Sequence, residues 1–392
     1  MTTTARRIGV VTVSRSDYGH LRPVLEGIRR DADLELVLFV AGMHLEPDFG
    51  STALEIEADG FAIAERIPMF ERGDSPEAVA ASTGRGVEGF ARAFARRRPD
   101  LLIVLGDRFE MLAAAVAALP FALPVAHIHG GEISEGAMDN QIRHAITKLA
   151  HLHFASAEPH ARRIAQMGEE AWRIHTVGGP GIDRIATMEA LTREALAREL
   201  ALPADRPWLL VTFHPVTLEY LDTACHVDEL LAALEKTDGT LVITYPNADT
   251  SGRLIIERLE EFAARHPGRC RVSRNLGDRL YLSLLRHADV MIGNSSSGLI
   301  EAPSFGLPAV NIGARQRGRL RGANVIDVEP ARDEILRGIE TAQTPAFRAR
   351  ARAAANPYGD GRAAPRIVEV LRTVPLDAGL VQKRFADSGG GA

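Results

Sequence analysis

Side chains capable of acid–base or metal chemistry gather in one short stretch, residues 127–148, which reads HIHGGEISEGAMDNQIRHAITK. His127 and His129 are two positions apart, so both are expected on one face of a strand. Imidazole is a common zinc ligand, but no cysteine lies nearby and no H-E-x-x-H pattern occurs. We therefore expect no metal here. A Gly-Gly turn after the strand should instead leave Glu132 facing a ligand.

Carboxylates suited to proton transfer occur at two more places. The hydrophobic run LLIVLGDRFE ends in a glycine followed by Asp107 and Arg108, which the turn should bring to the end of a strand. The alternative is that these two side chains pair with each other and cap the next helix. Farther along, Asp139 and Arg143 are four residues apart on a predicted helix, so they can form an ion pair.

Three other strand ends carry candidate binding groups. Arg15 follows the first strand and can meet an anionic ligand; alternatively it pairs with Asp17 in a cap before a helix that starts near Tyr18. His214 precedes a proline, which cannot continue a central strand, so His214 should lie exposed at the strand terminus. There it can transfer a proton or donate a hydrogen bond to a phosphate; alternatively, its role is only structural. Asn247, in ITYPNAD, can position a sugar or phosphate.

A run of three serines separates a buried strand from a helix: Ser295, Ser296 and Ser297. Hydroxyl groups and free N–H groups at a helix N-terminus form a phosphate cradle. Glu301 follows where it can accept hydrogen bonds from a ribose, and Arg315 follows the next strand as a second cationic contact. The alternative is a helix cap with spare arginines. No G-x-G-x-x-G follows the first strand, so a nicotinamide cofactor is not supported.

Short hydrophobic strands alternate with amphipathic helices along the chain, which is typical of buried parallel strands in βαβ units. Expected strands are residues 7–13, 34–42, 101–107, 124–130, 152–156 and 173–179, then 207–215, 240–246, 270–275, 288–296, 308–313 and 324–328. Expected helices include 20–30, 76–98, 108–119, 225–236, 251–265 and 280–286. The pattern predicts an α/β protein with two Rossmann-type, doubly wound domains.

The predicted domains are residues 1–180, with the carboxylates, and 181–355, with the serine run. Residues 356–375 should form a helix that crosses back to the first domain, and 376–392 a tail that is disordered at its end. Because most polar motifs fall at strand ends, we expect a ligand in a cleft between the domains.

Composition limits the function classes. The 392 residues suffice for two or three domains, and 46% hydrophobic with 25% charged residues is ordinary for a globular protein. The net charge of −5 gives no general attraction to nucleic acid or a membrane surface. Two cysteines argue against a disulfide framework, and no apolar run approaches 18 residues. We therefore expect a cytoplasmic protein.

Seven motifs in order carry a resemblance to a known family: SRSDYG, GDRFE, HIHGGE with RHAITKLAHLHF, FHPVT, YPNAD, MIGNSSSGLIEAPSFGLPAVNIGARQRGR and NPYGDGRAAPRI. Over residues 7–372 the chain resembles the hydrolysing UDP-N-acetylglucosamine 2-epimerases of sialic and legionaminic acid biosynthesis. The resemblance implies a GT-B-like fold, a UDP-sugar substrate, a homodimer or homotetramer, and no cofactor. It also implies a reaction in which H-2 is removed, UDP leaves to give a glycal, and water then adds at C1.

The resemblance also implies roles. UDP would be held by Ser295, Ser296, Glu301 and Arg315, with Arg15 and Arg108 near the pyrophosphate. His214 would contact the departing phosphate close to Asn247, and the proton-transfer candidates would be Asp107, Glu132 and Asp139. One departure stands out: the family commonly has two acids where this chain has Asp139 and Asn140. If the second acid transfers the proton, activity would fall or the substrate would differ.

Two other functions remain open at this point. A GT-B glycosyltransferase would use the same UDP cradle and would not need both Asp107 and Glu132. A UDP-sugar-binding protein that has lost catalysis is the other possibility, because Asn140 stands where the family commonly has an acid. The sugar can be UDP-GlcNAc or a UDP- or GDP-linked 2,4-diacetamido-trideoxyhexose.

Overall fold

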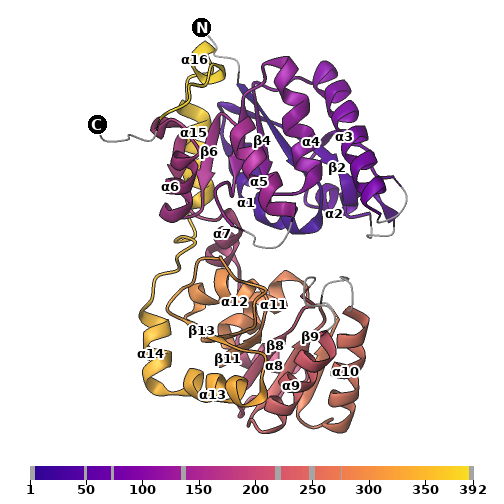
Figure 1. The fold of residues 1–392 in the computed structure, drawn as a ribbon, viewed down its shortest axis with the longest axis vertical. Coiled ribbons are helices and arrows are strands. Elements are labelled where there is room, and N and C mark those ends of the chain that lie inside the picture. Colours follow the sequence, from indigo (N-terminus) through magenta and orange to yellow (C-terminus); the bar gives the residue numbers. More distant parts are fainter. Residues whose placement is uncertain are drawn as a thin grey trace. The chain divides into compact units, whose positions relative to one another are not determined.

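The computed structural model describes residues 5–47, 51–71, 75–133, 138–216, 222–246, 252–274 and 276–387. The chain forms two compact units (Figure 1). The first contains residues 1–184 and 358–392, and the second contains residues 185–357. The domain boundary expected at residue 180 falls at the start of helix α7 (Pro180–Thr187). No helix in the described ranges is long and apolar enough to cross a membrane.

The first unit is built on a seven-stranded parallel sheet with the order β3-β2-β1-β4-β5-β6-β7. Its strands are β1 Arg6–Thr12, β2 Leu34–Ala41, β3 Ile63–Ile67, β4 Leu101–Leu105, β5 Val125–Ile128, β6 Leu152–Ala155 and β7 Ile174–Thr176. The chain leaves β1 in one direction to β2 and returns on its other side to β4, which is the topological switch of a doubly wound fold. Every residue of β4 is buried, as its unbroken apolar run predicts.

Helices cover the two faces of this sheet. They are α1 Arg15–Arg30, α2 Ala53–Ala58, α3 Pro76–Arg96, α4 Phe109–Ala118, α5 Met138–Leu149, α6 Glu158–Gln166 and α7, with 3-10 turns η1 Gly42–Leu45, η3 Leu119–Phe121 and η4 Ala171–Arg173. Strand β3 was not expected from the sequence. It is a half-buried edge strand that contains Glu65 and Arg66, so it lacks the apolar run that marks a central strand.

The second unit repeats the architecture with six parallel strands in the order β10-β9-β8-β11-β12-β13. The strands are β8 Trp208–Thr212, β9 Thr240–Thr244, β10 Cys270–Ser273, β11 Val290–Gly293, β12 Ala309–Ile312 and β13 Val325–Val328. The helices are α8 Arg193–Glu199, α9 Thr223–Glu235, α10 Gly252–Arg265, α11 Gly277–His287, α12 Ser297–Ile300, α13 Arg332–Gln343 and α14 Pro345–Ala353, with the 3-10 turn η6 Ala302–Phe305. The expected pair of doubly wound sheets is confirmed.

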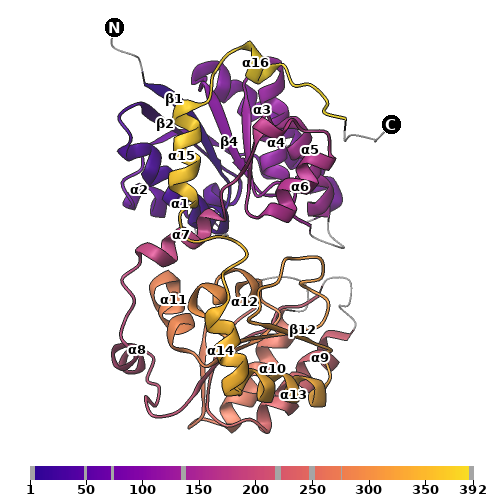
Figure 2. The same cartoon turned by 90° about the vertical axis from the view of Figure 1, so that its left-hand side faces the viewer.

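The C-terminal segment packs in the first unit, where helix α15 (Ala363–Thr373) lies along α1 (Figure 2). Asp183 fixes its start, because its carboxylate accepts hydrogen bonds from the backbone N–H groups of Ala363 at 2.9 Å and Ala364 at 2.6 Å. After a short helix α16 (Ala378–Val381), Lys383 contacts the buried carboxylate of Glu169 at 2.7 Å. The expected disorder of residues 388–392 concerns a segment outside the described residues.

Candidate active site

The two candidate carboxylates Asp107 and Glu132 lie at one edge of the sheet of the first unit. Asp107 follows β4, Glu132 follows β5 and Ser156 follows β6. These strands are neighbours and parallel, so their carboxyl ends meet at the same edge. The polar groups that follow them are thereby brought together, although up to 49 positions separate them in the chain.

Arg143, on the buried face of α5, joins these groups. Its Nη2 donates to Asp107 Oδ2, and its Nη1 lies 3.0 Å from the backbone oxygen of His129 and 3.6 Å from Glu132 Oε2. Only 5% of the Arg143 side chain is exposed. The sequence suggested Arg143 as a partner of Asp139 and did not include it among the site residues. The available signal was its position on the same helical face as the buried Ile146.

Glu132 accepts two hydrogen bonds on a single carboxylate oxygen. Nδ1 of His129 lies 2.6 Å from Oε1, and the Ser156 hydroxyl donates to the same oxygen at 2.5 Å. Burial raises the pKa of Glu132, but the charge and hydrogen bond of His129 and the charge of Arg143 outweigh burial and hold this pKa well below its usual value. Glu132 is therefore ionised and able to accept a proton.

The two histidines of the H-x-H motif do not share a strand face, contrary to the sequence expectation. His127 lies in β5 and is fully buried, with Nε2 2.7 Å from the carbonyl oxygen of Gly106. Burial lowers the pKa of His127 to about 3, so it is neutral and structural. His129 lies beyond the strand and has a φ of 62°, in the left-handed region, which turns its side chain toward Glu132.

The Gly-Gly turn is required by close packing. Gly131 has a φ of 73°, and a Cβ at this position would lie 2.4 Å from the backbone oxygen of His160 in α6. Only glycine allows the turn to approach α6 this closely. This approach brings Glu132 within reach of Ser156 and His160, two residues that the sequence analysis did not select. The signal for them was a serine directly after a buried strand, with a histidine four residues later.

Asp107 and Arg108 do not pair with each other. Arg108 makes two contacts with the fully buried Glu110, at 2.6 and 3.2 Å, while Asp107 binds Arg143. Asp139 is half-buried in the first turn of α5. Asp107 and Glu132 thus both lie beside the guanidinium of Arg143, while Arg108 pairs with Glu110.

Arg15 is the first residue of α1, which begins three residues earlier than expected. Its Nε lies 3.6 Å from Glu55 Oε2, and just over half of its side chain is exposed. The alternative pairing with Asp17 is wrong, since Asp17 accepts hydrogen bonds from the backbone of Val13 at 2.7 Å and from Thr12 Oγ1 at 3.1 Å. Arg15 is therefore accessible to an anionic ligand.

In the second unit, Asn294 connects the ends of the adjacent strands β11 and β8 by hydrogen bonds. Its Oδ1 accepts from the backbone N–H of His214 at 2.7 Å, and its Nδ2 donates to the His214 carbonyl at 2.8 Å. The preceding Gly293 has a φ of 133°, and a Cβ there would lie 1.9 Å from the Thr212 carbonyl oxygen. Arg315 Nη1 donates to the Asn294 carbonyl at 3.1 Å. The turn that carries the serines is thus held from both sides.

The serine run forms this turn and the start of α12, which has only four residues. Ser295 Oγ accepts from the backbone N–H of Ser297 at 3.3 Å, and Ser296 occupies the cap position. Ser297 is 7% exposed, and its hydroxyl has no hydrogen-bond partner among the residues that the structure describes. Glu301 follows directly and is half-buried. The helix is short, so the groups that this turn offers to a ligand are backbone N–H and hydroxyl groups rather than a long helix dipole.

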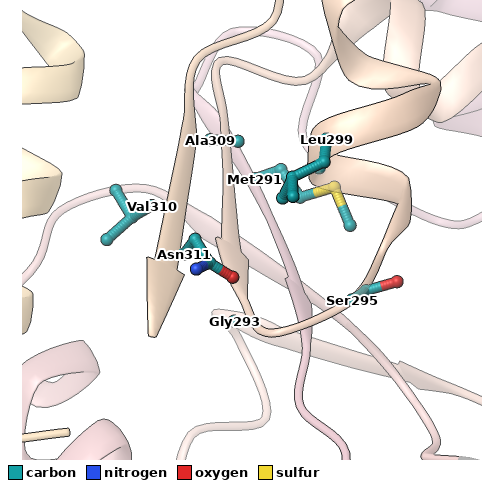
Figure 3. A pocket seen from close by; sticks show the side chains of 8 residues that line it. Met291, Gly293, Ser295, Leu299, Ala309, Val310 and Asn311 are labelled. Atoms are coloured by element: carbon teal, nitrogen blue, oxygen red, sulfur yellow. The ribbon is translucent and has the colours of Figure 1, made fainter. Parts of the chain in front are cut away.

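A small hollow lies beside this turn, between β11, β12 and α12 (Figure 3). It is lined by Met291, Leu299 and Asn311 among others, and Ser295 stands at its edge. Asn311 is buried and donates through Nδ2 to Asp327 at 2.7 Å. Its Oδ1 has no hydrogen-bond partner within the described ranges, so this hollow contains one polar group that a ligand or water can satisfy.

His214 does not have the exposure that was expected. It is 7% exposed, and burial together with the charge of Arg315 lowers its pKa to about 3. A neutral imidazole can still donate one hydrogen bond to a phosphate, but it is a poor general acid. Asn247, the remaining expected residue, lies outside the described residues.

A family model described as UDP-N-acetylglucosamine 2-epimerase matches residues 26–372. The chain is 38% identical to the UDP-N,N'-diacetylbacillosamine 2-epimerase (hydrolyzing) of Legionella pneumophila, covering 96% of this chain and 98% of that protein. It is 39% identical to the GDP/UDP-N,N'-diacetylbacillosamine 2-epimerase (hydrolyzing) of Campylobacter jejuni, covering 83% and 84%. The solved structure of UDP-GlcNAc 2-epimerase from Neisseria meningitidis bound to UDP-GlcNAc has the same fold, with a TM-score of 0.79, 16% identity and coverage of 93% and 99%.

Proposed function

This chain belongs to the UDP-N-acetylglucosamine 2-epimerase family, and from that premise we propose how its polar groups divide the work of a hydrolysing nucleotide-sugar 2-epimerase. Such an enzyme converts a nucleotide-linked 2-acetamido sugar into the free 2-epimer and a nucleoside diphosphate. The proposed proton-transfer groups belong to the first unit, and most of the proposed nucleotide-binding groups belong to the second, with Arg15 and Arg108 in the first.

The reaction has two steps. A carboxylate removes H-2, the electron pair of the C2–H bond forms the C1–C2 double bond, and the C1–O bond breaks to release the nucleoside diphosphate. Water then adds its oxygen to C1 of the glycal and loses one proton, while C2 takes up a proton on the face opposite to the one that H-2 left, which gives the free epimer. Since H-2 is weakly acidic, removal of the proton and stabilisation of the leaving group must act together.

The observation that carries this proposal is the pair of carboxylates held by one buried guanidinium. Arg143 contacts Asp107 and lies 3.6 Å from Glu132, and the pKa of Glu132 is held well below its usual value. Two carboxylates, one on either side of a guanidinium, can remove a proton from one face of C2 and deliver one to the other. A glycosyltransferase that uses a UDP-sugar has no need for this arrangement.

We assign nucleotide binding to the serine turn of the second unit. Backbone and hydroxyl donors at Ser295, Ser296 and Ser297 suit a diphosphate, and Arg315, which holds the turn, adds a positive charge. Glu301 would accept from the ribose hydroxyls. Arg15, Arg108, His214 and Asn247 stay proposed phosphate contacts.

For the sugar we propose a UDP-linked 2,4-diacetamido-2,4,6-trideoxyhexose of the diacetylbacillosamine type. The support is the activity for which the Legionella and Campylobacter relatives are named, at 38% and 39% identity to this chain. UDP-GlcNAc is the second candidate, because the matching family model is described by that substrate. A panel of UDP-GlcNAc and of UDP- and GDP-linked diacetylbacillosamine decides between them: the highest kcat/KM identifies the substrate, and a preference for UDP-GlcNAc contradicts the first choice.

Reaction in D2O tests the function. With the preferred nucleotide sugar, the enzyme should release one nucleoside diphosphate per free 2-epimeric sugar, and that sugar should carry deuterium at C2, as read by NMR. Release of UDP only after addition of an acceptor sugar would indicate a glycosyltransferase. Binding without release would indicate a protein that has lost catalysis, for which Asn140 is the sequence feature.

Loss of nucleotide contacts should weaken UDP binding without removing the proton-transfer groups. We expect Ser296→Ala to raise the Kd for UDP about tenfold, and Arg315→Ala to raise it about ten- to a hundredfold, because hydrogen bonds to charged groups are the stronger ones. Isothermal titration with UDP measures both. Arg321→Ala is the matched control, since Arg321 already pairs with Asp327 at 2.7 Å. An equal loss in the control would show that Arg315 acts only through overall charge.

A further inference from the structure

A chain of hydrogen bonds leads away from Glu132 into the first unit. The Ser156 hydroxyl lies 2.5 Å from Glu132 Oε1 and 2.9 Å from Nδ1 of His160, four residues farther along in α6. Ser156 is 2% exposed and His160 is 5% exposed, so both are shielded from water. Buried polar groups of this kind are fixed by their partners rather than by solvent.

The direction of this chain is set by counting protons. An ionised carboxylate only accepts hydrogen bonds, so the single proton of the Ser156 hydroxyl points to Glu132. Ser156 Oγ can then only accept from His160, which requires the proton of the His160 imidazole on Nδ1. Burial lowers the pKa of His160, although the charge of Glu132 opposes this. A neutral His160 imidazole with its proton on Nδ1 donates to Ser156 Oγ and so leaves the Ser156 proton for Glu132.

These donors act on one oxygen of the carboxylate. Ser156 and His129 both bind Oε1, while Oε2 lies 3.6 Å from Arg143 Nη1. We propose that Ser156 and His160 are positioning residues for proton transfer: the chain His160 Nδ1–H···Oγ–H···Oε1 fixes the Glu132 carboxylate so that Oε2 exchanges the proton with the sugar. This inference rests on the proposed function, in which Glu132 transfers a proton.

Close packing fixes the turn that carries Glu132 against helix α6. Gly131 presses against the backbone of His160, where a Cβ would come within 2.4 Å, and the carbonyl of Gly131 accepts a hydrogen bond from Arg163 of the same helix. The turn that carries Glu132 and the helix that carries His160 are thus held in one register. A displacement of a reacting group by about 1 Å can cost about a hundredfold in rate, so this register bears directly on turnover.

The charged and titratable groups facing Glu132 are His129 from its own turn, Arg143 from α5, and His160 and Arg163 from α6. Removal of the Ser156 hydroxyl leaves all of them in place but takes one donor from the ionised carboxylate. The pKa of Glu132 must then rise. Because the ionised form removes H-2, the acid limb of the kcat/KM profile should move to higher pH.

The test is Ser156→Ala in the full-length enzyme with its preferred nucleotide sugar. We expect kcat to fall about ten- to a hundredfold, with KM within about twofold, and the acid limb to rise by about one pH unit. Ser156→Thr keeps the hydroxyl and should recover most of the lost kcat. Ser82→Ala is the matched control, because Ser82 is equally buried and also makes two hydrogen bonds, at 2.8 and 2.7 Å, elsewhere in the first unit.

A second pair of variants keeps the proposal testable if Ser156→Ala does not fold. His160→Asn retains a donor near the Nδ1 position and should keep more kcat than His160→Leu, which retains none. Nitrogen-15 NMR of labelled histidine should show the Nδ1–H tautomer for His160. The Nε2–H tautomer, or a folded Ser156→Ala enzyme with unchanged kcat and pH profile, would overturn the proposal.

Failure of the function itself gives a different result. If Glu132→Gln is as active as the unmodified enzyme, then Glu132 does not transfer a proton, and the proposed function loses its acid–base assignment whatever Ser156 does. If Glu132→Gln is inactive while Ser156→Ala behaves like Ser82→Ala, the function stands and the positioning role is wrong.

Discussion

Glu132→Gln and Asp107→Asn are each expected to lower kcat by about a thousandfold or more, while the Kd for UDP stays within about twofold. Each amide has nearly the shape of the carboxylate it replaces, but it can neither accept the proton from C2 nor deliver one to it. Binding of UDP should persist because neither substitution removes a proposed UDP contact, most of which belong to the second unit. Steady-state release of UDP, deuterium incorporation at C2 and titration with UDP measure the three quantities separately.

The matched control is Glu158→Gln. Glu158 begins α6 near the same edge of the sheet, but its side chain is exposed and lies 3.9 Å from Arg162. This variant should match the unmodified enzyme. Full activity of both carboxylate variants would contradict the acid–base assignment. Deuterium exchange into C2 of unreacted substrate by only one of them would show which carboxylate removes H-2.

Arg143→Met should have an effect of similar size on kcat, for a different reason. The guanidinium contacts Asp107 and the backbone of His129, and it lies 3.6 Å from Glu132, with only 5% of its side chain exposed. Its loss leaves two carboxylates in a shielded site without their shared positive charge. We expect kcat to fall about a thousandfold and the pKa of Glu132 to rise. The acid limb of kcat/KM should therefore move to higher pH.

Arg143→Lys separates charge from geometry. A lysine restores a positive charge, but a single ammonium group cannot reach all of these partners in the planar arrangement of a guanidinium. We expect only partial recovery of kcat, with the pH profile closer to that of the unmodified enzyme. Arg162→Met, on the exposed face of α6, is the control for loss of an arginine. Additive effects of Arg143→Met and Asp107→Asn in the double variant would contradict the idea that the two residues act together.

Much of the architecture could be read from the sequence. Buried parallel strands are continuous apolar runs, so twelve of the thirteen strands in the described part of the chain were expected near their observed positions. Edge strand β3 was not expected, because its charged residues break the apolar pattern. Helices α2, α6, α8, α13 and α14 were also not predicted. Strand ends follow directly from this pattern, which is why Asp107, Glu132 and the serine run were found as candidate site residues.

The partners of those residues could not be read from the chain. Local spacing allowed an ion pair between Arg143 and Asp139, offered Asp17 as an alternative partner for Arg15, and predicted an exposed His214. In the structure Arg143 contacts Asp107 and lies 3.6 Å from Glu132, two partners that local spacing does not indicate. Arg15 lies near Glu55, and His214 is buried beside Arg315. Side-chain pairing depends on which strands are neighbours and how closely the loops approach, and neither is encoded in a spacing of three or four residues.

The sequence by itself determined two doubly wound sheets, the positions of the acids and serines at strand ends, and the resemblance to one enzyme family. Only the tertiary structure decided that one buried guanidinium serves two carboxylates and that Ser156 and His160 support Glu132. The physical reason is the junction of β4, β5 and β6. Parallel pairing brings their carboxyl ends together, and a glycine at position 131 lets the turn close against α6.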